Sequence, residues 1–379
     1  MKKKVLFVAT VVKTHIMEFH IPYLKMFQDM GWETAVAAKN DYEDPRDCVI
    51  PCCDTYYDIP FERMPWKSRN IRAYRQLRQI LEREHFDLIH CHTPVGAMVA
   101  RLAARNTRRQ GTKVIYTAHG FHFFRGAPLL NWILFYPPEW LLGHLTDVLV
   151  TINREDYAFA RKHIHAKRIE YVPGVGIDID RFSAPSGDPL EKRRELGFDE
   201  ADLLLLTVAE MTRNKNHSTV LKALALLKEE PEFHNMHYLI CGRGQQQAAL
   251  EQEAQKLGIR DHVVFLGYRQ DVPQLCRCSD IFCFMSFREG LSVALMEAMY
   301  CGLPAVCSRI RGNTDLIEDQ HNGLFAENRP EAVAQAIRML CRDPGLRRQL
   351  GQEAARTVER FSAPNVQKEM KSIYLSLEG

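Results

Sequence analysis

Hydrophobic residues gather in short runs of consecutive apolar positions, separated by longer segments with helical spacing. Such runs are typical of strands buried on both faces of a parallel sheet. In the first half of the chain, the predicted strands are residues 4–10, 33–38, 86–93, 113–120, 146–152 and 168–174. In the second half, they are residues 202–210, 237–244, 262–268, 279–286 and 303–309.

Segments with helical periodicity lie between these runs, most clearly at residues 70–85, 218–230 and 330–345. Alternating strands and helices predict βαβ units. Because the series occurs twice, we expect an α/β fold with two Rossmann-like, doubly wound domains that face a central cleft. Ligands of such sheets bind beyond the carboxyl ends of the strands, so candidate site residues are sought there.

A polar stretch separates the two series and contains Pro185, Gly187 and Pro189. Proline and glycine interrupt regular structure, so we place the boundary near Ser186. The predicted domains are residues 1–185 and 186–361, followed by a terminal segment, residues 362–379.

Composition excludes some classes of function. The formal net charge of +3 over 379 residues is too small to indicate a nucleic-acid partner. The 11 cysteines follow no secretory signal and form no C-x-x-C pair, so we expect reduced thiols in a cytoplasmic protein. The longest apolar stretch contains Pro137 and Pro138, which argues against a membrane span and leaves contact with a membrane surface open.

Basic residues concentrate between residues 61 and 125, which contain 13 Lys and Arg against 4 Asp and Glu. The predicted helix at 70–85 places an apolar stripe beside three arginines. The stripe comprises Ile71, Tyr74, Leu77 and Leu81, and the arginines are Arg72, Arg75 and Arg78. The stripe can be core packing with a solvated flank, or the flank can meet anionic lipid headgroups together with the aromatics that follow residue 122.

The loop after the strand at 279–286 carries two glutamates. Ser292 is a predicted N-cap of a helix that ends at Gly302. Free amides in the first turn attract phosphate or hydroxyl groups, and Glu289 can reach the same space. Glu297, on the helix, can accept two hydrogen bonds from a ribose diol. Both acids can equally be ordinary helix-start charges.

Two further loops of the second half border the same predicted edge. Arg213 and Lys215 follow the strand at 202–210 and suit a diphosphate, although a solvated basic turn is the alternative. Gly242 and Gly244 follow the next strand and permit close backbone approach, without forming a full G-x-G-x-x-G.

Histidines mark the strand ends of the first half. His119 and His92 each follow a predicted strand and can either face a ligand or be structural. Thr14, His15 and His20 follow the first strand, where they either border an incoming acceptor or cap a helix. Asp178 and Asp180 form a D-x-D tripeptide, a pattern that binds a metal–nucleotide complex in other enzymes. Here we expect a turn without metal.

Together, these motifs resemble those of retaining GT-B glycosyltransferases of family 4. The most specific stretch is residues 288–325, and residues 13–24 and 116–132 resemble the branch that builds exopolysaccharide or capsule on a lipid carrier. The resemblance implies an acceptor-binding first domain, a donor-binding second domain and a terminal helix that returns to the first domain.

The resemblance also implies individual roles. Glu289 would contact the donor sugar, Glu297 the ribose, Lys215 the diphosphate, and His119 would lie near the reacting sugar. The amides of Gly290, Leu291 and Ser292 would lie near sugar and phosphate. The implied reaction is hexosyl transfer with retention, from a UDP-sugar rather than a GDP-sugar, to a polyprenyl-linked saccharide. It would take place at the cytosolic face of the cell membrane with no metal or other cofactor.

One position departs from the family pattern, which has an arginine where this chain has Glu210. Arg213 is the candidate replacement, and Glu210 is expected to contact Arg213 or a donor hydroxyl. Three alternatives stay open: a nucleotide-sugar 2-epimerase of the same fold, a non-catalytic nucleotide-sugar-binding subunit, and a nicotinamide oxidoreductase. The last lacks its glycine fingerprint after the first strand. The sequence indicates neither the sugar nor the oligomeric state.

Overall fold

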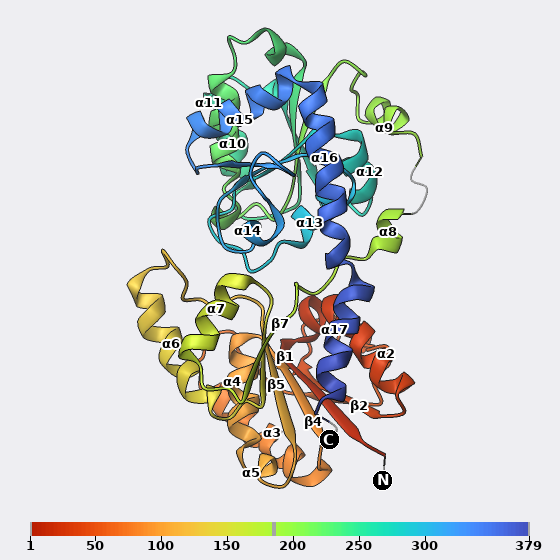
Figure 1. The fold of residues 1–379 in the computed structure, drawn as a ribbon, viewed down its shortest axis with the longest axis vertical. Helices are drawn as coiled ribbons and strands as arrows, with labels where there is room; N and C mark the ends of the chain where they lie inside the picture. The colour runs from red at the N-terminus through yellow and green to blue at the C-terminus, as the bar shows by residue number, and fades with distance from the viewer. Residues whose placement is uncertain (1, 184–186, 378–379) are drawn as a thin grey trace. The chain divides into compact units, whose positions relative to one another are not determined.

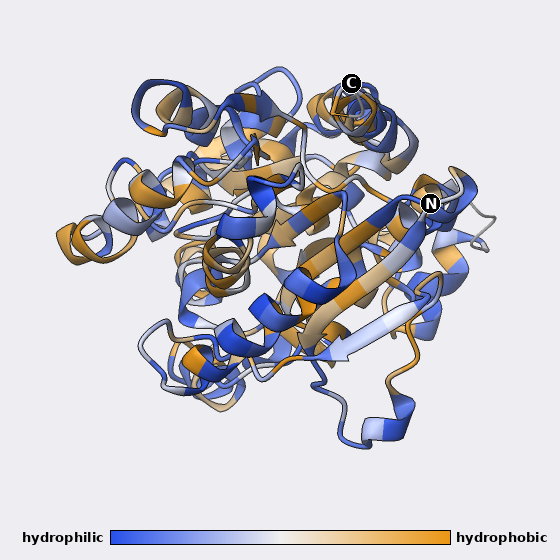
Figure 2. Cartoon of the chain, turned by 90° about the horizontal axis from the view of Figure 1, so that it is seen from below, coloured by the Kyte–Doolittle hydropathy of each residue, from blue (hydrophilic) through white to orange (hydrophobic). Residues whose placement is uncertain are grey.

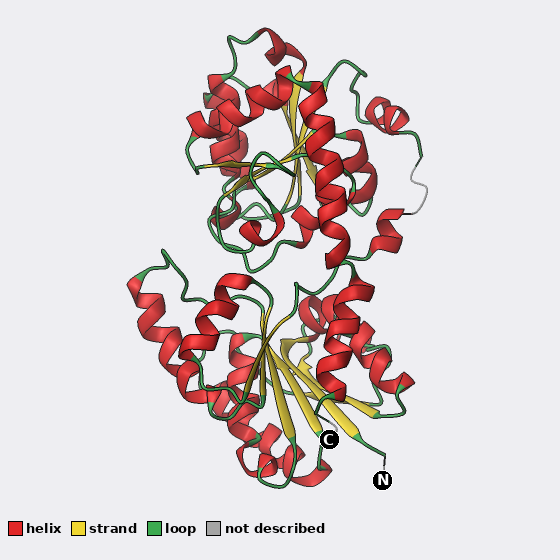
Figure 3. Ribbon diagram, in the orientation of Figure 1, coloured by secondary structure: helices red, strands yellow, loops and turns green. Residues whose placement is uncertain are grey.

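The computed structural model describes residues 2–183 and 187–377, which form two compact units. Unit 1 comprises the chain up to Val175 together with the segment from Val366 onward, and unit 2 runs from Gly176 to Asn365. Each unit contains one parallel sheet with helices packed around it (Figures 1 and 3). The predicted α/β fold with two doubly wound units is confirmed.

Unit 1 has seven described strands and helices on both sides of the sheet. The strands are β1 (Lys4–Val11), β2 (Glu33–Lys39), β3 (Thr55–Asp58), β4 (Leu88–His92), β5 (Lys113–Ala118), β6 (Val148–Thr151) and β7 (Arg168–Tyr171). The helices are α1 (Met17–Phe19), α2 (Ile21–Asp29), α3 (Arg69–Glu84), α4 (Pro94–Ala103), α5 (Arg105–Arg108), α6 (Leu129–Gly143) and α7 (Arg154–His163). The π-helical turn η1 (Val12–Ile16) follows β1, and α17 (Ala363–Leu375) supplies the returning segment.

Unit 2 has six described strands. They are β8 (Leu203–Val208), β9 (Met236–Cys241), β10 (Val263–Gly267), β11 (Ile281–Phe284), β12 (Ala305–Ser308) and β13 (Leu324–Ala326). Its helices are α8 (Ile179–Ser183), α9 (Pro189–Glu195), α10 (His217–Leu226), α11 (Gln247–Lys256), α12 (Val272–Cys278), α13 (Val293–Tyr300), α14 (Asn313–Leu316), α15 (Pro330–Arg342) and α16 (Pro344–Val358). The short 3-10 turn η3 (Arg213–Lys215) follows β8.

Both sheets are wound outward from a central strand. The order in unit 1 is β3-β2-β1-β4-β5-β6-β7, and in unit 2 it is β10-β9-β8-β11-β12-β13. Every described pairing between these strands is parallel. The direction of winding therefore reverses between β1 and β4, and again between β8 and β11. At such a switch point the loops diverge and leave room for a ligand.

Consecutive apolar residues become strands because helices cover both faces of each sheet. In β1, Val5, Leu6, Phe7 and Val8 are all fully buried, although alternate residues face opposite layers. The hydropathy colouring shows strands that are mainly hydrophobic and helices that carry both kinds of residue (Figure 2). Burial on both faces explains why these strands lack the alternation of a half-exposed sheet.

The division between the units differs from the predicted boundary. Ser186 lies outside the described residues, and the structural division falls earlier, at Gly176. Ile177 pairs with Ser362, and the Ala363 amide donates to the Ile177 carbonyl at 2.9 Å. The segment from Gly176 onward therefore packs within unit 2, although the sequence analysis assigned it to the first domain.

Two short strands and one helix face were not anticipated. β3 and β13 lie at sheet edges and are too short to give a clear apolar run. On α3, Ile71 is 57% exposed, whereas Asn70 is buried and donates to the Met64 carbonyl. The predicted stripe is therefore wrong at Ile71, because the buried face begins at Asn70 and Ala73.

Candidate functional site

In unit 2, two predicted site residues meet at the switch point of the sheet. Lys215 lies in η3 after β8, and Glu289 lies in the loop after β11. Lys215 Nζ donates to Glu289 Oε1 at 2.7 Å, and both side chains are largely buried. Lys215 Nζ also lies 5.0 Å from the centre of the Phe284 ring. A cation and a carboxylate held together here can separate to meet a phosphate and a hydroxyl.

The two loops are joined by their backbones. The Phe287 amide donates to the Asn214 carbonyl at 2.8 Å, and the Asn214 side chain donates to the Arg288 carbonyl at 2.9 Å. Asn216 adopts a left-handed conformation with φ of 52° and donates to the Met285 carbonyl at 3.1 Å. These hydrogen bonds fix the two loops relative to each other, so that Lys215 and Glu289 lie side by side.

The start of α13 matches the prediction. The Ser292 hydroxyl caps the helix by accepting from the Leu295 amide, and Gly302 follows the helix end with φ of 72°. Gly290 and Leu291 precede the cap, so their amides lie at the helix N-terminus. This arrangement can bind an anion.

A loop after β12 supports the same turn and was not predicted as part of the site. Arg311 Nε donates to the Glu289 carbonyl at 3.1 Å. A Cβ on Gly312 would lie 2.4 Å from the Gly290 carbonyl oxygen, so only glycine permits this approach. The signal was the Arg-Gly-Asn sequence shortly after a predicted strand, a turn pattern at the expected edge.

Glu297 lies on α13 and is mostly buried, with Arg181 Nη1 of α8 at 4.0 Å from its carboxylate. Burial raises the pKa of Glu297 to about 7, while Arg181 lowers it and Asp178 raises it further. Near neutral pH, the Glu297 carboxyl group is therefore about half protonated and half ionised. Asp178 accepts a hydrogen bond from the Arg181 amide, as in a helix-start turn.

The remaining predicted donor residues are placed less tightly. Glu210 and Arg213 are exposed, and the described residues show no ion pair between them. Of the two contacts expected for Glu210, the one with Arg213 is absent among the described residues, and the one with a donor hydroxyl stays a prediction. Gly242 makes a close approach, but to protein: a Cβ there would lie 2.0 Å from the Ala209 carbonyl oxygen.

In unit 1, four predicted histidines converge at the other switch point. His15 lies in η1 and His20 immediately before α2, whereas His92 ends β4 and His119 follows β5. One ring nitrogen from each lies within 4.8 Å of the other three. His20 and His92 stack with ring centroids 3.7 Å apart. Loops of three strands thus bring together residues separated by about a hundred positions.

Burial sets the protonation of this cluster. It lowers the pKa of His119 to about 3 and that of His15 to about 4. Burial and the neighbouring imidazoles also lower the pKa values of His20 and His92 well below their usual range. All four rings are therefore neutral at physiological pH. His119 can offer a hydrogen bond, but it cannot serve as a cation.

A fifth histidine, His90, lies beneath the cluster and has its partners in place. Its Nδ1 lies 2.8 Å from the Tyr374 hydroxyl, and its Nε2 lies 2.8 Å from the Thr117 hydroxyl. Thr14 is exposed at the cluster's edge, where its hydroxyl donates to Asp41 at 3.4 Å.

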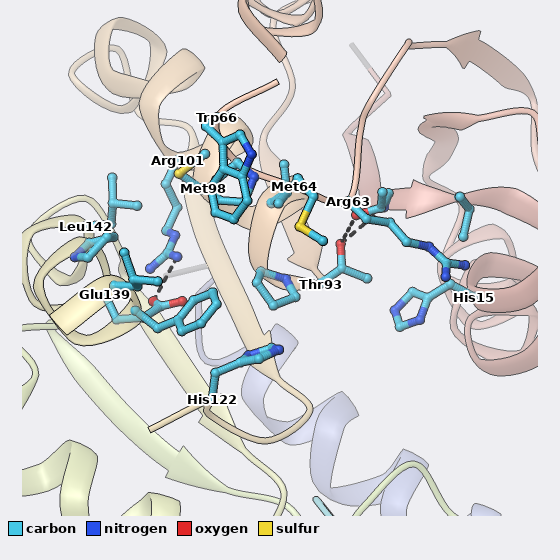
Figure 4. Close-up of a pocket in the computed structure, with 18 of the residues that line it drawn as sticks. His15, Arg63, Met64, Trp66, Thr93, Met98, Arg101, His122, Glu139 and Leu142 are labelled. Carbon is cyan, nitrogen blue, oxygen red and sulfur yellow. Dashed lines mark hydrogen bonds and ion pairs between the residues drawn. The ribbon is translucent and has the colours of Figure 1, made fainter. Parts of the chain in front are cut away.

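A cavity of about 530 Å³ opens beside the cluster, within unit 1 (Figure 4). Thr14 and His15 line it, together with apolar residues from α4 and α6 and from the segment before α3. Arg101 and Glu139 form an ion pair of 2.9 Å in its wall, and Tyr116 donates to the same carboxylate at 3.0 Å. A mainly apolar cavity with a few fixed polar groups is typical of a small-molecule site.

Sequence reasoning missed Arg63, Met64 and Trp66 in this cavity. They lie in the segment before α3, where no periodicity marks them, and Trp66 is 67% exposed. A tryptophan among charged residues was the available signal. Among the described residues, no helix combines the length and apolar character needed to cross a membrane.

Comparisons with known proteins assign the family. Residues 23–181 match the family described as "Glycosyltransferase Family 4", and residues 188–357 match "Glycosyl transferases group 1". A relative from Bacillus subtilis (strain 168), named "Putative glycosyltransferase EpsD", is 40% identical over 99% of this chain and 97% of its own length. The chain belongs to the family 4 glycosyltransferases.

Two more distant relatives have informative names. The "UDP-Gal:alpha-D-GlcNAc-diphosphoundecaprenol alpha-1,3-galactosyltransferase" of Escherichia coli is 25% identical, with 70% of each chain covered. A crystal structure of Anabaena Alr3699/HepE with UDP and glucose superposes with a TM-score of 0.79, covering 99% of this chain and 100% of that one at 20% identity. The structural likeness supports the GT-B fold that the resemblance implied.

Proposed function

We propose that this glycosyltransferase moves a hexosyl group from a UDP-sugar to a polyprenyl-linked saccharide, with retention, in the synthesis of a cell-surface polysaccharide. The observation that most supports donor binding in unit 2 is the ion pair between Lys215 and Glu289, 2.7 Å long, beside the capped start of α13. The named substrates of the Escherichia coli relative support the donor and the lipid carrier.

The geometry suggests how the pair acts. Without a ligand, Lys215 and Glu289 neutralise each other. When the donor binds, Lys215 turns to the diphosphate, Glu289 accepts a hydrogen bond from the sugar, and the amides at Gly290 to Ser292 meet the phosphate or sugar oxygens. Glu297 accepts hydrogen bonds from the ribose diol. The lysine and the helix N-terminus then neutralise the leaving charge without a metal ion at the diphosphate.

The proposed transfer occurs on one face of the donor sugar. The acceptor hydroxyl oxygen forms a bond to the anomeric carbon as the bond from that carbon to the diphosphate oxygen breaks. The hydroxyl proton passes to the departing diphosphate oxygen, so charge and atoms balance. His119, neutral because of its burial, donates a hydrogen bond near the reacting sugar.

For the acceptor, the apolar cavity of unit 1 supports a lipid-linked substrate and a membrane-facing location on the cytoplasmic side. Met64 and Trp66 at its edge are exposed, and α6 exposes further leucines and isoleucine. Arg72, Arg75 and Arg78 are exposed on α3, where they can meet anionic headgroups. Arg78 also forms an ion pair with Glu82 at 2.9 Å, so it contributes less than Arg72 and Arg75 to the attraction for anionic headgroups.

Donor binding is tested first, by thermal unfolding with a panel of UDP- and GDP-sugars in the presence of a chelator. A ligand at about 100 times its dissociation constant should stabilise the protein by about 2.7 kcal/mol. Glu297→Gln should abolish most of this gain. Glu331→Gln, an exposed glutamate at the start of α15, is the matched control and should keep it.

Transfer is tested with the donor so identified and a synthetic polyprenyl-linked sugar. Lys215→Ala should lower kcat by roughly 10²–10³, as for removal of a charge-stabilising donor. Nuclear magnetic resonance of the product should show the anomeric configuration of the donor. Conversion of the donor to an epimer without acceptor would instead favour the epimerase, and donor binding without either reaction would favour a non-catalytic subunit.

A further inference from the structure

The histidine cluster of unit 1 contains more buried polar atoms than the described protein can satisfy. His15 Nε2, both ring nitrogens of His20 and His92 Nε2 are buried and have no hydrogen-bond partner among the described residues. Buried polar atoms are nearly always satisfied, and each one left unpaired costs about 1–3 kcal/mol. Several such atoms within one small cluster point to a missing partner.

The spacing of the nitrogens suits one small cation. One ring nitrogen from each of His15, His20, His92 and His119 falls within 4.8 Å of the others. His92 Nδ1 and His119 Nε2 lie 3.3 Å apart. Two imidazole nitrogens bound at about 2.0–2.1 Å to one tetrahedral zinc ion lie roughly 3.3–3.4 Å apart. His92 Nδ1 and His119 Nε2 thus already have the separation of one tetrahedron edge. His15 Nε2 and one ring nitrogen of His20, both unpaired, would complete the coordination, whereas His92 Nε2 would lie outside it.

We propose that His15, His20, His92 and His119 bind one divalent transition-metal ion, with zinc the expected occupant. Imidazole nitrogen suits zinc, copper, nickel and iron, whereas magnesium and calcium require oxygen ligands. The rings are uncharged, which is the form that binds metal. Zinc has no redox chemistry and binds four ligands in a tetrahedron, so four imidazole nitrogens would complete its coordination.

The fold gives such an ion a defined task. It would tie η1 to the ends of β4 and β5, three segments that share the switch point of the sheet. His15 and His119 keep part of their surface exposed, and His15 also lines the large cavity, so an ion can reach the cluster.

A metal on His119 would also set its tautomer. Nε2 is the atom that faces His92, so coordination there leaves the proton on Nδ1. If the proposed function holds, Nδ1 is then the atom that can donate to a sugar hydroxyl. The metal is a positioning element of unit 1 and has no part at the diphosphate. It departs from the expectation, drawn from the resemblance, that the protein holds no metal.

Metal content provides the direct test and does not depend on activity. The chain of residues 1–379, free of any histidine tag, is purified without chelator, and its metal content is measured by elemental analysis. We expect about one zinc ion per chain, falling to below roughly a tenth in His20→Asn and in His92→Asn. His234→Asn, an exposed histidine of unit 2, is the control and should leave the content unchanged.

Because His20 and His92 are buried in the core, their variants could lose metal by misfolding. His15→Gln, in the partly exposed turn η1, is the milder variant, and circular dichroism reports its folding. Cobalt(II) added to metal-free protein should give the intense visible bands of tetrahedral coordination, weakened in folded His15→Gln. Nickel or copper bound in place of zinc, and lost in the same variants, would also support the site.

Two outcomes would overturn the proposal. One is wild-type protein that carries no stoichiometric metal and takes up none on titration with zinc, which would leave ordered water as the partner of these nitrogens. The other is metal that persists in folded His15→Gln and His20→Asn. Donor stabilisation in chelator is measured separately, so failure of the donor assignment and failure of the metal site give different results.

Discussion

At the scale of single residues, Glu297 should couple donor binding to pH. Its pKa is raised to about 7, chiefly by burial, so the carboxylate is protonated below that pH and ionised above it. A ribose diol donates two hydrogen bonds, which only the ionised form accepts with both oxygens. Donor affinity should therefore rise as the pH rises through about 7 and level off above it. One pH unit below the pKa, affinity should fall by up to about tenfold.

Calorimetry with a UDP-sugar across this pH range measures the effect. A nucleotide-sugar is suitable because its diphosphate is esterified at both ends and does not titrate near neutrality. Glu297→Gln should bind more weakly and lose the pH dependence, whereas Glu331→Gln should behave as wild type. A wild-type profile that is flat through pH 7 would show that Glu297 does not hold the donor.

Some contacts between site residues could be predicted from the sequence, and others could not. Lys215 and Glu289 stand in loops that follow strands. Neighbouring parallel strands bring such loops to one edge of the sheet, so their meeting could be expected. The approach of Gly312 to Gly290 could not, because it depends on how two loops cross in three dimensions. The partner in the close approach of Gly242, the Ala209 carbonyl, could not be predicted for the same reason, and a part for Gly242 in donor binding stays a prediction.

At the scale of elements, the loop after β12 fixes the turn that carries Glu289. Gly312 has φ of 83°, and a Cβ there would overlap the Gly290 carbonyl. Gly312→Ala should therefore displace the start of α13 and weaken donor binding by at least about tenfold, or 1.4 kcal/mol. Calorimetry with the donor measures this loss.

Gly197 offers a matched control for backbone strain. It has φ of 85°, but a Cβ there would meet nothing within 4 Å. Gly197→Ala should cost about 1–2 kcal/mol of stability through the left-handed conformation and leave donor affinity unchanged. Equal loss of affinity in both variants would mean that strain, rather than the clash at Gly290, disturbs the site.

Helix α6 should contact the membrane surface. Leu130 and Ile133 are 62% and 61% exposed. Exposing such apolar side chains to water is unfavourable, so contact with lipid would stabilise them. Leu130→Ser together with Ile133→Ser should lower binding to vesicles that contain anionic lipid by about tenfold or more, because each change removes about 1 kcal/mol of apolar contact. Co-sedimentation measures binding.

Leu226→Ser, at an exposed leucine of α10, is the control and should leave vesicle binding unchanged. If vesicle binding is also unchanged in the α6 double variant, this surface is excluded as the membrane contact.

Long, fully buried strands and the regular helices between them could be predicted because their apolar pattern is set by local sequence. β3 and β13 could not, since β3 consists of one Thr, two Tyr and one Asp, and β13 has only three residues, so neither gives a run of apolar positions. The exposed Ile71 marks a similar limit: Asn70 is buried because its side chain bonds to the loop at Met64, and periodicity does not register such a bond.

At the scale of the whole molecule, the C-terminal segment completes unit 1. Val366, Met370, Ile373 and Tyr374 are all buried there, and Tyr374 bonds to His90. Burying side chains of this size contributes about 1.5–3 kcal/mol each, so together the four supply roughly 6–12 kcal/mol. A typical domain is stable by about 5–15 kcal/mol in total. Deleting residues 366–379 should therefore unfold unit 1.

Unit 2 should survive this deletion, because its own core does not include the removed residues. Hydrogen exchange should show lost protection in β1, β4 and β5 but retained protection in β8, β9 and β11, and a UDP-sugar should still stabilise unit 2. Tyr374→Phe, which removes only the hydroxyl that bonds to His90, should cost about 1–3 kcal/mol and leave both units folded. Protection retained in β1 after the deletion would contradict the assignment of this segment to the core of unit 1.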